Sequence, residues 1–80
     1  MTRYYFHFRD GVDSALDPDG RECDDLQAVG RIAVKAARDI IASEVRTGAV
    51  DLRYRIDVED GTGALVHTID FEDAVTFSRS

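Results

Sequence analysis

The longest regular pattern of apolar residues in the chain lies between Asp24 and Gly48. Its apolar positions recur every three or four residues, the spacing that places side chains on one face of an α-helix. They are Leu26, Val29, Ala33, Ala36, Ala37, Ile40 and Ile41. We expect Asp24 to cap the helix start with Gln27 in a capping box, and Gly48 to end the helix. The pattern predicts one long amphipathic helix packed on a core.

Three other segments alternate between apolar and polar residues, which is typical of strands with one buried face. They are residues 3–9, 51–59 and 64–71. The side chains expected to face the helix are Tyr4, Phe6 and Phe8 in the first strand, Leu52, Tyr54, Ile56 and Val58 in the second, and Leu65, His67, Ile69 and Phe71 in the third. Burial of apolar area selects these sets over the opposite ones.

Glycine and aspartate mark the turns between these segments. Asp10-Gly11 and Asp17-Pro18-Asp19-Gly20 follow the first strand, with short extended pieces expected at 12–16 and 21–23. The run from Asp60 to Gly63 predicts a hairpin between the last two strands. In residues 72–80 we expect one helical turn, with Phe77 over a core edge, before a polar tail.

The predicted fold is α+β, a three- to four-stranded antiparallel sheet with the helix packed on one face. Its element order is strand, short strand, helix, strand, strand. Residues 1–80 form a single domain, of which 72–80 are expected to be a partly flexible tail. The second sheet face is mostly charged and is expected to stay in contact with water. Its side chains would be Tyr5, His7, Arg9, Arg53, Arg55, Asp57, Glu59, Val66, Thr68 and Asp70.

Size and charge limit the classes of function. Eighty residues bury one small core, so a homodimer is expected. A net charge of −6 argues against general nucleic-acid binding, and the acidity is concentrated between Asp10 and Asp25. Neither a signal peptide nor an apolar run of membrane-spanning length is present, and Cys23 has no second cysteine to pair with. We expect a cytoplasmic protein without membrane association.

The acidic first loop suggests a calcium site, but its spacing does not fit one. Aligning Gly20 with the glycine of an EF-hand loop places Asp17 and Asp19 at ligand positions but Ala15 and Leu26 at the first and twelfth. A turn held by Asx-type hydrogen bonds is the favoured interpretation. His7 and His67 fall on opposite sheet faces, which argues against a two-histidine metal site. No metal and no cofactor are expected.

Candidate nucleophiles lack the neighbours that would activate them. Cys23 precedes the helix, where the dipole favours a thiolate, but Glu22, Asp24 and Asp25 surround it with negative charge. We therefore expect no enzyme. A small-ligand site around Tyr5, His7 and Arg9 is the weakest of the functional hypotheses.

The outer helix face carries a basic stripe, which we define as Arg31, Lys35, Arg38 and Arg46. An ordinary solvated helix face is the favoured interpretation, because Asp39 lies within the stripe. Two functional hypotheses remain. In the first, the chain is a non-enzymatic interaction domain that self-associates, or binds an unknown protein partner, through a sheet edge or this stripe. In the second, it is a small regulatory nucleic-acid-binding or antitoxin-like protein. The candidate interaction surface is Arg31, Lys35, Arg38, Arg46, Arg53 and Arg55.

The opening run Arg3-Tyr4-Tyr5-Phe6-His7-Phe8-Arg9-Asp10-Gly11 resembles the start of a family of small bacterial proteins known only as a domain of unknown function. The acidic turn 17–20, the alanine-rich run 33–42, Gly63 and the segment 69–71 also fit this family. Its members often have proline at the position of Asp70. The resemblance implies a domain spanning nearly the whole chain, but no activity, cofactor or catalytic residue.

Overall fold

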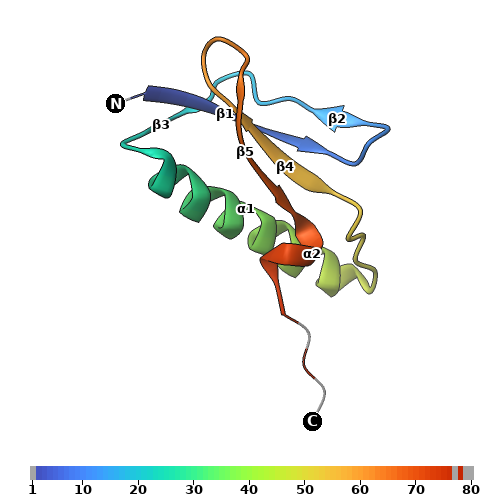
Figure 1. Cartoon of the computed structure of the whole chain (residues 1–80). Helices are drawn as coiled ribbons and strands as arrows, with labels where there is room; N and C mark the ends of the chain where they lie inside the picture. The colour runs from blue at the N-terminus through green and yellow to red at the C-terminus, as the bar shows by residue number, and fades with distance from the viewer. Residues whose placement is uncertain (1, 77, 79–80) are drawn as a thin grey trace.

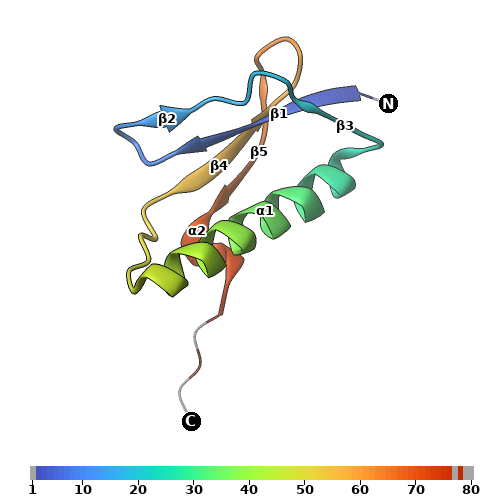
Figure 2. The same ribbon diagram turned by 180° about the vertical axis from the view of Figure 1, so that it is seen from behind.

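An antiparallel sheet packed on one long helix forms the architecture of the computed structural model, which describes residues 2–76 and 78. The elements, in chain order, are β1 (Thr2–Arg9), β2 (Ser14–Ala15), β3 (Arg21–Cys23), α1 (Leu26–Thr47), β4 (Arg55–Glu59), β5 (Leu65–Asp70) and α2 (Phe71–Ala74). Figures 1 and 2 show α1 lying along one side of the sheet. The α+β prediction is confirmed, with one more short strand before the helix than expected.

Strand β1 organises the sheet because it pairs along both of its sides. The strand order is β2-β1-β4-β5, and β3 also pairs with β1. The eight residues of β1 are long enough for β3 to pair with its first half, Thr2 opposite Cys23, and for β2 to pair with its end, Phe8 opposite Ala15. The described sheet therefore ends at β5 on one side and at β2 and β3 on the other.

The helix begins one residue later than predicted. Asp25, not Asp24, is the N-cap, and its carboxylate accepts a hydrogen bond from the Ala28 N–H at 2.8 Å. This shift moves the third helical position to Ala28, so the predicted capping box with Gln27 is wrong. Gly48 ends the helix as expected, with a φ of 90° that favours glycine.

The core lies between the helix and the sheet. Helix residues Val29, Ala33, Ala37 and Ile41 are buried. Leu26 was predicted to lie on the buried face, but it is 55% exposed and lies outside the core. From the sheet side, Tyr4, Ile56 and Val58 are buried, and Phe6 and Phe8 pack against them partly buried. The predicted inward faces of the first two strands are confirmed.

The second half of the predicted strand 51–59 forms β4, but its first half is a turn. The Asp51 carboxylate accepts hydrogen bonds from the Arg53 N–H at 3.0 Å and from the Arg53 guanidinium at 2.8 and 2.9 Å, which turns the chain before Tyr54. The Glu44 carboxylate accepts from the Asp51 N–H at 3.0 Å. Local side-chain bonds therefore compete successfully with the strand pattern.

A β-bulge changes the start of β5. The pairing shifts between Val58, opposite His67, and Glu59, opposite Leu65, which leaves Val66 as an extra residue. As a result Leu65 is 60% exposed and Val66 packs partly buried against the core, the reverse of the prediction. His67 and Ile69 keep the predicted inward direction, and a Cβ on Gly30 would lie 3.8 Å from the His67 ring.

The predicted helical turn after the last strand is confirmed as α2. Phe71 is fully buried and Ala74 is 1% exposed. The Phe71 ring packs with Phe8 and Tyr54, with centroids at 5.5 and 5.9 Å, so α2 is anchored on the core. The position predicted for Phe77 lies outside the described residues.

Candidate functional site

The outer face of the sheet contains a buried ionic cluster instead of the water-exposed face that was predicted. We define the outer cluster as His7, Arg9, Arg55, Asp57, Glu59 and Thr68. Asp57 is 5% exposed and His7 is 8% exposed. The prediction failed because Arg9, Arg55 and Thr68, which flank Asp57 on three strands, lie against it and exclude water.

Asp57 is the centre of this cluster. Its carboxylate accepts from Arg9 Nη1 at 2.9 Å, from Arg55 Nε at 3.1 Å and from the Thr68 hydroxyl at 3.0 Å. Burial raises the pKa of the Asp57 carboxyl, but the hydrogen bonds from Arg9, Thr68 and Arg55 lower it by more, so the pKa lies below its ordinary value. The carboxylate therefore stays ionised and holds β1, β4 and β5 together.

The acidic first loop is fastened to this face through Asp17 and His7. The Asp17 N–H donates to His7 Nδ1 at 3.1 Å, while His7 Nε2 lies 3.4 Å from Glu59 Oε1. Because Nδ1 accepts, the neutral ring carries its proton on Nε2, toward Glu59. The Asp17 carboxylate accepts from the N–H groups of Asp19 and Gly20, which supports the Asx-turn interpretation, and also from Phe6 in β1.

These contacts make the outer cluster a structural feature. Within residues 2–76 and 78, every buried side-chain nitrogen and oxygen has a hydrogen-bond partner. The same part of the chain contains no group of three or more His, Cys, Asp or Glu side chains arranged to hold a metal ion. Tyr5, His7 and Arg9 lie along one strand, with the Tyr5 and His7 rings 6.5 Å apart.

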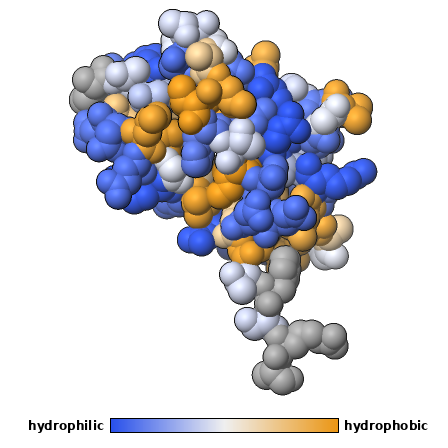
Figure 3. Space-filling view, viewed as in Figure 1, coloured by the Kyte–Doolittle hydropathy of each residue, from blue (hydrophilic) through white to orange (hydrophobic). Residues whose placement is uncertain are grey.

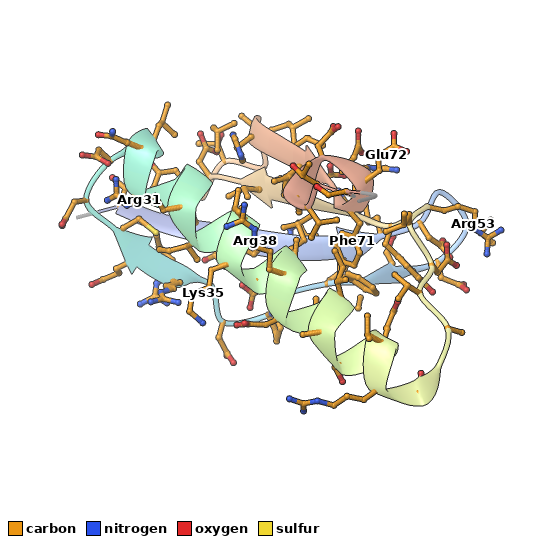
Figure 4. All side chains as sticks on the ribbon, turned by 90° about the horizontal axis from the view of Figure 1, so that it is seen from below. Arg31, Lys35, Arg38, Arg53, Phe71 and Glu72 are labelled. Carbon is orange, nitrogen blue, oxygen red and sulfur yellow. The ribbon has the colours of Figure 1, made fainter. Side chains whose placement is uncertain are left out.

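The six predicted interaction residues do not form one surface. Arg53 pairs with Asp51 at 2.8 Å and lies far from Arg31 in Figure 4. Arg55 pairs with Asp57 at 3.1 Å on the outer face of the sheet, away from the helix. The hydrogen bond from Arg53 lowers the pKa of Asp51 to about 2. Lys35 pairs with Asp39 at 2.8 Å, and Arg46 lies in the last helical turn. These acids interrupt the positive charge that phosphate binding requires.

A groove on α1 brings together three members of the basic stripe. It has a volume of about 460 Å³ and is lined by Gly30, Arg31, Val34, Lys35, Arg38 and Asp39. Arg38 is exposed, and its Nε donates to the Ala74 carbonyl at 2.7 Å, which joins α2 to α1. Among the described residues, no carboxylate lies within ion-pair distance of Arg31.

The groove lies beside β5, the strand at the open edge of the sheet. No described strand pairs with the outer side of β5, and α1 contacts both β5 and β4. Leu26 and Leu65 are both more than half exposed. Figure 3 shows apolar areas separated by hydrophilic ones on the face that carries β5. The sequence pattern indicated a sheet edge and the basic stripe as interaction surfaces, but it did not specify which strand forms the edge, because strand order is not visible in local periodicity.

The unpaired main-chain groups of β5 can be assigned from the ladder. Phe71 N–H donates to the Tyr54 carbonyl at 3.0 Å, which makes this a hydrogen-bonded pair. Since such pairs alternate along an antiparallel ladder, Ile69 and His67 are also hydrogen-bonded to β4. The main-chain groups of Thr68 and the N–H of Asp70 therefore point to the open edge.

None of the helices in residues 2–76 and 78 has the length and apolar character needed to cross a bilayer. Comparison with curated proteins gives no match, and comparison with solved structures gives none either. Comparison with protein families matches residues 3–72 to a domain of unknown function, DUF6894. This match runs from the first strand to α2, so the chain belongs to the DUF6894 family.

Proposed function

We propose that this chain is a non-enzymatic interaction domain that self-associates by pairing β5 with β5 of a second copy. The observation that carries the proposal is the open side of β5, with the main-chain groups of Thr68 and Asp70 directed outward. Unpaired strand edges are strong templates for adding another strand. A two-fold axis beside Thr68 would join the two sheets into one continuous antiparallel sheet.

Features of the edge agree with a pairing surface. Natural edge strands are often shielded by lysine or proline, by β-bulges, by charges pointing inward, or by a covering loop. In β5 the bulge is confined to its first residues, next to Leu65. The six residues from Leu65 to Asp70 contain no lysine and no proline. The small size of the domain adds a thermodynamic reason for self-association, because a folded chain of 80 residues buries a limited share of its surface.

The oligomeric state of Thr68→Pro tests the proposal. Proline removes the Thr68 N–H, which points away from β4, so the monomer ladder stays intact while pairing with a second copy is blocked. In sedimentation over a range of concentrations, we expect the unaltered protein to form a reversible dimer and Thr68→Pro to remain monomeric. Circular dichroism checks that the variant is folded.

Thr68→Ala is the matched control. It removes the hydroxyl that donates to Asp57 at 3.0 Å but keeps the main-chain N–H, so it should still form the dimer. Asp70→Pro gives a second test, because the Asp70 φ of −80° already suits proline. A monomeric unaltered protein, or a folded proline variant that dimerises as strongly as Thr68→Ala, would contradict the proposal.

A further inference from the structure

The surface beside β5 carries complementary charges at its two ends. The end near Leu65 lies beside the first half of α1, since Gly30 is close to the His67 ring. The other end leads into α2, whose first turn carries Glu72 and Asp73. Both carboxylates are exposed, and no cation in residues 2–76 and 78 lies within ion-pair distance of them.

The position of α2 is firmly held. Phe71 is fully buried, and the Arg38 guanidinium binds the Ala74 carbonyl at 2.7 Å. Figure 4 shows Glu72 on the outer side of α2, away from α1. The acidic turn is therefore presented at a fixed place next to the end of the open strand.

Among the groove residues, Arg31 is the cation nearest the Gly30 end of α1. Lys35 pairs with Asp39, and Arg38, although exposed, donates through Nε to the Ala74 carbonyl at the α2 end. Arg31 precedes Arg38 by seven residues, which is about 10 Å along a helix axis. Arg31 thus lies toward the N-terminal end of α1, away from the acidic turn of its own chain. Figure 4 shows Arg31 and Glu72 well apart.

From this arrangement we propose that the acidic first turn of α2, Glu72 and Asp73, docks on Arg31 in the α1 groove of a second copy. The inference rests on the self-association proposed above. A two-fold axis that pairs β5 with β5 runs the two strands in opposite directions, so the α2 end of one copy meets the Gly30 end of the other. Each dimer then contains two symmetric contacts between Arg31 and the partner's acidic turn.

These contacts supply specificity and register to the strand pairing. Main-chain hydrogen bonds alone allow an edge strand to slip along its partner. Opposite charges at the two ends favour the alignment that brings them together and disfavour shifted ones. Because they lie at the rim of the interface, they are also screened by salt.

Charge reversal and exchange test this inference. We expect Arg31→Glu and Glu72→Lys each to raise the dimer dissociation constant about tenfold, measured by sedimentation at low salt, because each places like charges together. The double variant Arg31→Glu with Glu72→Lys should return the constant to within about threefold of the unaltered protein. The difference between single and double variants should shrink at high salt.

Arg46→Glu is the matched control, because it makes the same charge change on the same helix but in its last turn, outside the groove. It should leave the dissociation constant nearly unchanged. The inference fails if Arg31→Glu raises the dissociation constant no more than Arg46→Glu does, or if the double variant dimerises no more tightly than the single variants. If Thr68→Pro still abolishes the dimer in that case, the edge pairing stands. A monomeric unaltered protein would overturn both proposals.

Discussion

At the scale of single residues, Asp57 shows how burial can depend on residues far away in the chain. Its alternation with Ile56 and Val58 correctly predicts that it faces away from the helix. Its burial comes from Arg9, which is 48 positions earlier, and from Thr68 on the neighbouring strand. Local periodicity gives the direction of a side chain, but not the length and position of the side chains that cover it.

Asp57→Asn tests the importance of the outer cluster. The amide keeps the shape of the carboxylate but leaves the Arg55 guanidinium without its counter-charge and Arg9 with only Glu59, at 3.5 Å. We expect the free energy of unfolding to fall by about 2 to 3 kcal/mol, measured by urea denaturation. Asp39→Asn, which disrupts the exposed pair with Lys35, should cost less than about 0.5 kcal/mol. Equal effects of the two substitutions would show that the cluster adds no more stability than an exposed ion pair.

Leu65 and Val66 give a second example at this scale. The alternating pattern assigns Leu65 to the core, but the bulge opposite Glu59 reverses the two residues. One extra residue in a strand moves the side chains before it to the other face. The hairpin turn at Asp60 has the composition expected of a turn, and its carboxylate accepts from Thr62 and Ala64, but this composition does not specify the bulge.

At the scale of elements, α1 was the most predictable part of the chain. Its 3.6-residue periodicity identified the buried positions Val29, Ala33, Ala37 and Ile41, and glycine marked its end. Only the start differed, since both Asp24 and Asp25 are suitable capping residues. The pairing of Cys23 with Thr2 continues β3 up to residue 23, which leaves Asp25 in the extended conformation that an N-cap adopts.

A pair of alanine substitutions distinguishes the two candidate caps. Asp25→Ala removes the acceptor for the Ala28 N–H and should lower the free energy of unfolding by about 1 kcal/mol. Asp24→Ala should change it by less than about 0.5 kcal/mol, as expected for an exposed surface position. Thermal or urea denaturation of both variants gives the comparison, and a larger loss for Asp24→Ala would contradict the assignment of the cap.

The first loop was correctly predicted as a turn held by Asp17, but its wider role was not. The Asp17 carboxylate also accepts a hydrogen bond from the Phe6 N–H, and the Asp17 N–H donates to His7 Nδ1. These two bonds fasten the loop to β1. Gly20 passes so close to the sheet that a Cβ would lie 2.8 Å from the Tyr5 ring, and its φ is +69°. These requirements arise from the docking of the loop on the sheet and are not visible in the composition of the turn.

At the scale of the whole molecule, several carboxylates together make the stability of the fold depend on pH. The pKa values of Asp10, Asp17, Asp51, Asp57 and Asp60 are all lowered in the folded protein. A lowered folded pKa means that the unfolded chain binds protons more readily, so the stabilisation is present above the unfolded pKa and is lost as pH falls through the folded value.

We therefore expect the free energy of unfolding to decrease as the pH falls below about 4, the ordinary range of aspartate. For Asp51 the loss should extend to about pH 2, where its folded pKa lies. Urea denaturation at pH 5, 4 and 3 measures the decrease. In Asp57→Asn the slope should be smaller, because one of the contributing groups is absent. A free energy of unfolding that increases from pH 5 to pH 3 would contradict the lowered pKa values.

Local pattern in the sequence determined the helix, the inward faces of β1 and β4, and the turns at Asp17 and Asp60. Each depends on residues within a few positions of one another, where periodicity and turn chemistry act. Tertiary structure alone decided the burial of Asp57, the bulge at Val66, and the position of β5 at an open edge beside the α1 groove. These depend on which strands pair and how their side chains meet, which local periodicity and turn composition do not specify.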